Sequence, residues 1–89
     1  MNSTLFVRQL VEEGFPAPVV VTREQGELGM HSHPFEAKAL VVAGEITIRI
    51  GNDERLYAAG DVFHVPANVE HAERYGQDGV QYLAGRKSL

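Results

Sequence analysis

Short runs of β-branched and aliphatic residues, separated by turn residues, constrain the fold of this chain more than any other feature. In one run, Ile46, Ile48 and Ile50 alternate with polar residues, which is the pattern of a strand with one buried face. Turn residues interrupt the runs roughly every 8–12 residues, as is typical of all-β sandwiches and barrels. The predicted strands are residues 19–23, 37–43, 46–50, 55–58, 62–65, 70–75 and 80–84. We therefore expect an all-β barrel or sandwich.

The segments between these strands have the composition of turns and loops. We expect tight turns at residues 43–45 and 51–54 and a further turn at 76–79, because glycine, asparagine and aspartate tolerate positive φ. Residues 25–29 have the composition of a loop. The sequence shows no linker, internal repeat or low-complexity tract, so we expect a single domain over residues 1–89.

The first residues follow a different period. Residues 3–13 carry apolar side chains at helical spacing. These apolar residues are Phe6, Val7, Leu10 and Val11. Asn2 or Ser3 can cap such a helix at its start, and Gly14 can end it. We expect a short amphipathic helix packed on the outside of the barrel.

Two histidines separated by one residue precede the second predicted strand. Side chains two residues apart on a strand point to the same face, so the imidazoles of His31 and His33 can converge on one metal ion. Pro34 favours an extended conformation at His33, which suits this geometry. We expect the fold to bring His71 to the same place, giving three protein ligands and open coordination positions. In the alternative interpretation, the three histidines line the barrel and bind only water.

The spacing of these histidines resembles the two sequence motifs of the cupin superfamily. The first motif, G-x5-H-x-H-x(3,4)-E-x6-G, is matched at His31, His33 and Gly44. The second, G-x5-P-x-G-x2-H-x3-N, is matched at Gly60, Pro66 and His71. The resemblance covers residues 18–85 and implies a small cupin jelly-roll barrel, also called a double-stranded β-helix. It further implies one divalent transition metal (Fe, Mn, Ni or Zn) and a reaction such as dioxygenation, isomerisation or decarboxylation of a small metabolite.

The chain departs from the first motif at the metal-binding glutamate, whose position is occupied by Ala37. Glu36, the nearest carboxylate, comes one residue too early, and a shift of one residue turns a strand side chain to the opposite face. Glu36 can join the histidines as a metal ligand only if the strand bulges after Pro34. Otherwise it is a surface charge or a hydrogen-bond partner of a histidine.

Smaller departures affect three other motif positions. Gln25 stands where the first motif opens with glycine, Asn68 replaces a glycine of the second motif, and Tyr75 replaces its final asparagine. Asparagine tolerates the left-handed conformation, so the second of these changes is mild.

Further side chains have the strand parity of His71. Glu73 and Tyr75 share it, and Tyr82 on the last strand can join them inside the barrel. These three residues either pack in the core or, if the lumen holds a ligand, contact a substrate. In the second case we expect Tyr75 to be the first choice for a hydrogen bond and Glu73 to be an alternative carboxylate ligand or a proton acceptor. His64 occupies no motif position and is expected to be structural or at the surface.

Composition excludes several classes of function. The formal net charge is −4, and lysine and arginine are scattered singly except at Arg86-Lys87, which argues against a nucleic-acid surface. No apolar run approaches the ~20 residues that cross a bilayer. The absence of cysteine favours a cytoplasmic location, and the small core of an 89-residue chain favours a homodimer, because association buries further apolar area. The other expected partner is a small-molecule ligand or substrate. A metal-dependent enzyme, a non-catalytic binding or sensing module and a metal-free structural barrel all remain open.

Overall fold

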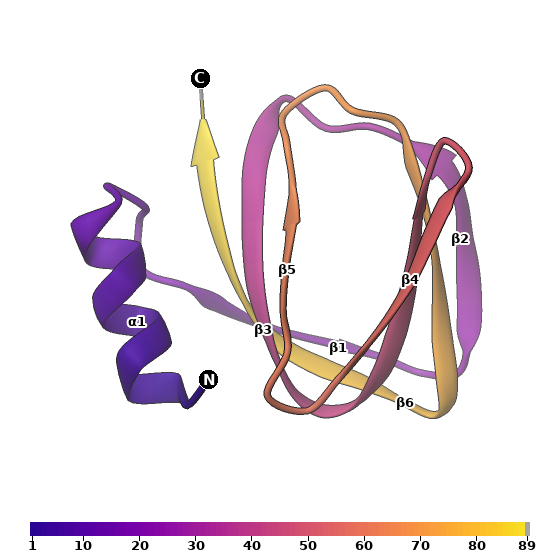
Figure 1. Ribbon diagram of the computed structural model, residues 1–89, viewed down its shortest axis with the longest axis horizontal. Helices are drawn as coiled ribbons and strands as arrows, with labels where there is room; N and C mark the ends of the chain where they lie inside the picture. The colour runs from indigo at the N-terminus through magenta and orange to yellow at the C-terminus, as the bar shows by residue number, and fades with distance from the viewer. Residues whose placement is uncertain (89) are drawn as a thin grey trace.

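Residues 1–88 of the computed structural model form one helix and six strands (Figure 1). The elements are α1 Ser3–Glu12, β1 Val19–Arg23, β2 Gly26–His31, β3 Phe35–Ile50, β4 Asp53–Ala58, β5 Val62–Val65 and β6 His71–Ser88. All strand pairs are antiparallel, and the sheet rolls around a common interior with α1 outside it. The predicted all-β barrel with a short N-terminal helix is confirmed.

Two long strands, β3 and β6, run side by side through both walls of the barrel. In one wall, residues 80–84 of β6 pair with β1, and residues 37–40 of β3 pair with β5. In the other wall, the first residues of β6 pair with β2, and residues 45–50 of β3 pair with β4. The two strands pair with each other in both walls, so they connect the two halves of the barrel.

The expected turns at residues 43–45 and 76–79 are bends within β3 and β6 rather than chain reversals. The β3–β6 register shifts between Val41 and Ala43 and again between Gly44 and Ile46. Gly44 has a φ of 71° and Gly79 a φ of 72°, which favours glycine at both. The two bends lie against each other so closely that a Cβ on Gly44 would overlap the carbonyl oxygen of Gly79. Glycine at a barrel corner lets a strand change walls without ending.

The segment at residues 25–29, expected as a loop, is largely strand β2. Every residue of β2 before His31 is exposed, so it lacks the apolar alternation that identifies a half-buried strand. β2 is held by its pairing with β6, in which Gly26 opposes Tyr75 and Leu28 opposes Glu73. Backbone hydrogen bonds hold this strand in place, and such bonds do not depend on residue type, so the composition of residues 25–29 did not indicate a strand.

Strand parity separates the interior of the barrel from the helix-covered outer face. Ala37, Ala39 and Val41 of β3 point into the main core. Leu40, of opposite parity, points outward and packs against Phe6, Leu10 and Phe15. Past the bend at Gly44, β3 adds Ile46 and Ile48 to this core. The other strands contribute Val21, Phe63, Val65, Tyr75, Val80, Tyr82 and Ala84.

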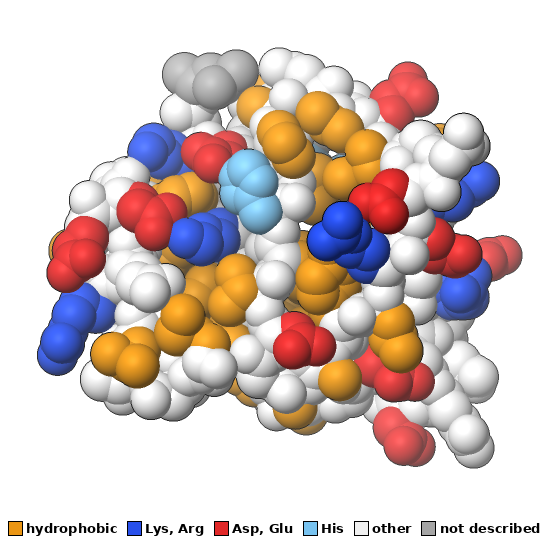
Figure 2. Space-filling view, in the orientation of Figure 1, with side chains coloured by type: hydrophobic (Ala, Val, Ile, Leu, Met, Phe, Trp, Pro, Cys, Tyr) orange, Lys and Arg blue, Asp and Glu red, His pale blue; other side chains and the backbone are white. Residues whose placement is uncertain are grey.

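The wall of the barrel is open between β4 and β5, since each of these strands pairs with β3 only. On the face shown in Figure 2, hydrophobic side chains gather in a hollow with charged side chains at its edges. A pocket between these strands is lined by Ile48, Ile50, Tyr57 and His64, together with Asp53 and Arg55.

Asn2 caps α1, because its side-chain Oδ1 accepts a hydrogen bond from the Leu5 backbone N–H at 2.9 Å. We expect Asn2→Ala to lower the free energy of unfolding by about 1 kcal/mol. Urea unfolding of the metal-free protein measures this loss. Ser3→Ala, at the other position that the sequence offers as a cap, is expected to cost clearly less. Equal losses in the two variants would contradict the assignment of Asn2 as the cap.

Among residues 1–88, no helix has both the length and the apolar character that crossing a membrane requires.

Candidate metal centre

Three histidine rings lie together where β2 and β6 pair. His31 ends β2, His71 begins β6, and the two are direct partners in the antiparallel register. Their ring centroids are 4.3 Å apart. The ring of His33, in the segment between β2 and β3, lies 5.1 Å from that of His71 and 6.3 Å from that of His31. The fold therefore returns His71 to the His31–His33 pair, as the motif spacing predicts.

Each of these histidines is oriented by a backbone carbonyl two residues away. The contacts run from Nδ1 of His31 to Gly29 O (2.7 Å), of His33 to Phe35 O (2.9 Å) and of His71 to Val69 O (3.0 Å). A carbonyl oxygen can only accept, so each Nδ1 carries a proton and donates it. In the neutral imidazole, Nε2 then keeps its lone pair and is ready to bind a metal.

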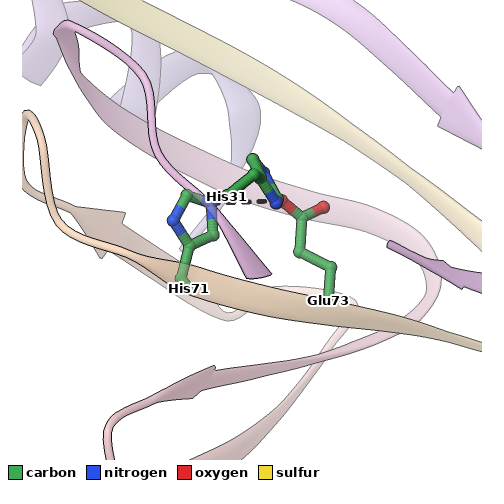
Figure 3. Close-up of side chains that lie close together, drawn as sticks. All are labelled: His31, His71 and Glu73. Carbon is green, nitrogen blue, oxygen red and sulfur yellow. Dashed lines mark ion pairs between the residues drawn. The ribbon is translucent and has the colours of Figure 1, made fainter. Parts of the chain in front are cut away.

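Glu73 brings a carboxylate to two of these Nε2 atoms. Its Oε2 lies 3.4 Å from Nε2 of His31 and 3.3 Å from Nε2 of His71 (Figure 3). Among residues 1–88, the side chains whose ligand atoms all lie within 4.8 Å of one another are His31, His71 and Glu73. Two nitrogen lone pairs and a carboxylate oxygen thus face a common point with no proton between them in the neutral form. Such a donor set fits a divalent cation.

Tyr75 holds the second oxygen of this carboxylate. Its hydroxyl donates to Glu73 Oε1 at 3.0 Å, which leaves Oε2 to face the histidines. Burial raises the pKa of Tyr75 to about 12, and the charge of Glu73 and the hydrogen bond to it act in the same direction. Burial and then the charge of Glu73 also raise the pKa of Tyr82. Both phenols keep their protons at neutral pH, so both remain hydrogen-bond donors.

His33 has a different environment from the other two histidines. Its ring stacks on that of Phe35, with centroids 4.0 Å apart and an interplanar angle of 7°. It lines the same cavity as His31 and His71 but lies outside their group of converging ligand atoms. His33 therefore lies next to the centre, but its ring nitrogens are not among the converging ligand atoms.

The structure does not bring Glu36 to the histidines. The register from Phe35 to Val41 is uninterrupted, so the bulge that a Glu36 ligand requires is missing from this part of β3. Glu36 points to the outer face, where its Oε2 lies 2.6 Å from Nε2 of His64. His64 is exposed, as expected of a surface histidine. Without a bulge, strand parity turns Glu36 to the face of the sheet opposite the histidines.

The centre opens onto a cavity of about 140 Å³ inside the barrel. The cavity is lined by His31, His33, His71, Glu73, Tyr82, Arg23, Arg86, Leu28, Phe35, Ala37, Ala39, Phe63, Val65 and Ala84. Of the three residues expected to contact a substrate, Glu73 and Tyr82 line this cavity, whereas Tyr75 supports Glu73 and lies outside the lining.

Arg23 and Arg86 also line this cavity, and neither was predicted from the sequence to do so. Arg86 has the same parity as Tyr82 and Ala84, but it lies beyond the predicted end of the last strand, since β6 continues to Ser88. Arg23 is the last residue of β1, two residues after the buried Val21. Parity with Val21 inside the predicted strand at residues 19–23 would have found Arg23, and parity carried past residue 84 would have found Arg86.

Comparisons with known proteins agree with this architecture. The Cupin domain family matches residues 19–80. A cupin-2 domain containing protein from Shewanella frigidimarina aligns at 22% identity and a TM-score of 0.66, over 76% of this chain and 66% of that one. A cupin superfamily protein from Desulfitobacterium hafniense aligns at 18% identity and a TM-score of 0.68, over 79% of this chain and 64% of that one.

A third similar structure is that of the DMSP lyase DddQ from Ruegeria pomeroyi. It aligns at 25% identity and a TM-score of 0.68, over 78% of this chain and 36% of that one. This chain thus spans about two thirds of the first two relatives and about a third of the lyase. No curated protein matches the sequence.

Proposed function

This chain belongs to the cupin superfamily, and we propose that it is a metal-dependent enzyme acting on a small metabolite inside its barrel. In this proposal His31, His71 and Glu73 hold one divalent transition metal, with His33 beside it. Iron, manganese, nickel and zinc all accept such nitrogen and oxygen ligands, and supply in the cell decides between them. The similar DMSP lyase is an enzyme of this fold, and it supports the catalytic version of the proposal.

One observation carries the proposal: three lone-pair donors converge while the imidazole protons point away. Backbone carbonyls hold the Nδ1 protons of His31 and His71, so in the neutral form of the two rings both Nε2 atoms face Oε2 of Glu73 without a proton to share. Desolvated acceptors that face one another are unfavourable, and a cation removes the conflict. His71 is 1% exposed, so water does little to relieve the conflict at that ring, whereas the side chain of His31 is 29% exposed.

The donor set suits catalysis because it is incomplete. Two histidines and one carboxylate leave coordination positions free, as in non-haem iron oxygenases and in catalytic zinc sites. When bound, a metal with these ligands supplies Lewis-acid or redox chemistry at its free positions. The chain itself orients the carboxylate through Tyr75, limits water with the apolar walls of the cavity and offers the protonated phenol of Tyr82 to a ligand.

The second candidate is a non-catalytic module that binds or senses a metal or small ligand. The connections favour it, because only two residues separate β1 from β2 and β3 from β4. Connections this short leave little chain near the cavity to close over a substrate.

The test is metal analysis of untagged protein, followed by oxygen uptake with a panel of small acids and thiols. We expect close to one equivalent of a transition metal and turnover of at least one compound. Bound zinc without oxygen uptake would exclude the dioxygenase version. A compound that raises the melting temperature without forming product would favour the binding module, and protein that takes up no metal would overturn both versions of the metal centre.

Tyr75 provides a graded test of the centre. Tyr75→Phe removes the hydroxyl that donates to Glu73 Oε1 but leaves the three proposed ligands in place. We expect metal affinity to fall roughly 10-fold, at the lower end of the 10- to 100-fold loss typical of residues that orient a metal ligand. Competition with a chromophoric chelator measures the change. Tyr57→Phe is the matched control: Tyr57 is partly buried, packs against the core and lies outside the metal centre, so this change should leave affinity unchanged. Equal affinity in the Tyr75 and Tyr57 variants would contradict the role of Tyr75.

A further inference from the structure

Two arginines line the barrel cavity, and the proposed metal centre uses neither of them. Arg86 lies near the end of β6 and Arg23 at the end of β1. Among residues 1–88, the carboxylates that pair with arginine or lysine take Lys38, Arg55 and Arg74 as partners, and none pairs with Arg23 or Arg86. Both arginines are exposed and line the cavity, so both are accessible to a ligand that enters it.

Arg86 is positioned next to the histidines by an aromatic ring. Its guanidinium carbon lies 5.5 Å from the centroid of the Phe35 ring, and that ring stacks on His33. The ring of His33 in turn lies 5.1 Å from that of His71. A guanidinium held over an aromatic face keeps its planar fork of donors free for a carboxylate.

The charges of the lining favour an anion. Among residues 1–88, Glu73 is the one carboxylate in the cavity lining, and it faces the proposed metal, whereas Arg23 and Arg86 carry two positive charges. A bound divalent cation makes the cavity more positive still. Positive charge concentrated within low-dielectric walls attracts anionic ligands.

The remaining lining and the volume limit the rest of the ligand. Much of the remaining lining is apolar, formed by Ala37, Ala39, Phe63, Val65 and Ala84. A volume of about 140 Å³ is well below the ~300–1,000 Å³ of pockets for drug-sized ligands. The ligand therefore combines a small apolar body with an anionic group, which is the composition of a small carboxylic acid rather than of inorganic phosphate.

We propose that the cavity binds a small carboxylic acid whose carboxylate pairs with Arg86, with Arg23 adding to the positive field. The inference deepens the proposed function, since it names the substrate class of the same cavity. It depends on the metal centre only for how the rest of the ligand is oriented, because the contact with Arg86 needs no metal.

The test is isothermal titration calorimetry, in which malonate or its uncharged isostere malonamide is added to metal-loaded protein and to EDTA-treated protein. We expect malonate to bind both forms and malonamide to bind at least about 10-fold more weakly. Arg86→Gln should weaken malonate binding about 10- to 100-fold, as expected for a charge-assisted hydrogen bond. Arg49→Gln is the control, because it removes the same charge elsewhere. Arg49 lies on the polar side of residues 46–50 of β3 and lines a different pocket.

The outcomes separate this inference from the metal centre. Equal binding of malonate and malonamide, equal effects of Arg86→Gln and Arg49→Gln, or binding of inorganic phosphate in place of malonate would each overturn it. Protein that binds malonate through Arg86 but takes up no metal would overturn the metal centre and support this inference. Protein that takes up metal but binds malonate independently of Arg86 would support the metal centre and overturn this inference.

Discussion

Glu73→Gln is expected to lower the affinity for a divalent transition metal at least about 100-fold. Glutamine keeps the size of the side chain and can still accept the hydrogen bond from Tyr75, but it removes the negative charge that faces His31 and His71. Loss of a residue that only orients a ligand costs roughly 10- to 100-fold, so loss of a charged ligand should exceed that range. Chelator competition and metal analysis of the purified variant measure the effect.

Glu36→Gln is the matched control for this experiment. It makes the same chemical change on the outer face of β3, where Glu36 pairs with His64. We expect its metal affinity to equal that of the unmodified protein. The opposite result, with metal lost from the Glu36 variant and kept by the Glu73 variant, would show that β3 bulges after Pro34 and that Glu36 is the carboxylate ligand.

Gly44→Ala is expected to destabilise the barrel by about 2–5 kcal/mol. Alanine at a φ of 71° costs roughly 1–2 kcal/mol. Its Cβ would also overlap the backbone of Gly79 and approach Cα of Val80 at 3.0 Å. This backbone can move only if the pairing of β3 with β6 is disturbed, so overpacking adds roughly 1–3 kcal/mol. The sum is a large part of the ~5–15 kcal/mol by which a domain is stable.

Gly51→Ala isolates the backbone contribution to that loss. Gly51 has a φ of 58°, but a Cβ there would meet no atom within 4 Å. We expect it to cost only the roughly 1–2 kcal/mol of the left-handed conformation. Urea unfolding of both variants without metal gives the comparison, and failure of the Gly44 variant to fold would agree with the larger loss. Equal stability of the two variants would contradict the close contact of the two bends.

The three histidines show how far the sequence led toward the candidate site. Side chains alternate along a strand, so the spacing of His31 and His33 places both on one face whatever the rest of the fold does. The resemblance to the cupin motifs added His71, and the three rings do lie together. The same parity argument placed Glu36 on the opposite face unless a bulge intervened, and the register there is regular.

The connections were harder to predict than the strands. Gly44 suits a tight turn and a barrel corner equally well, because both require positive φ. Only the pairing of β3 with β6 on both sides of the bend shows that the strand continues. β2 escaped prediction for a related reason, since its stability comes from partners on β6 rather than from its own residues.

The sequence by itself determined the alternation that makes a barrel and the residue types and parity of the histidines. It could also name Glu73 as a second choice of carboxylate. Only the tertiary structure decided that Oε2 of Glu73 lies between two Nε2 atoms, and that Arg86 shares their cavity. The physical reason is that strand period fixes the face to which a side chain points, whereas the neighbours it meets there come from distant segments. Register and strand length, which bring those segments together, are properties of the whole sheet.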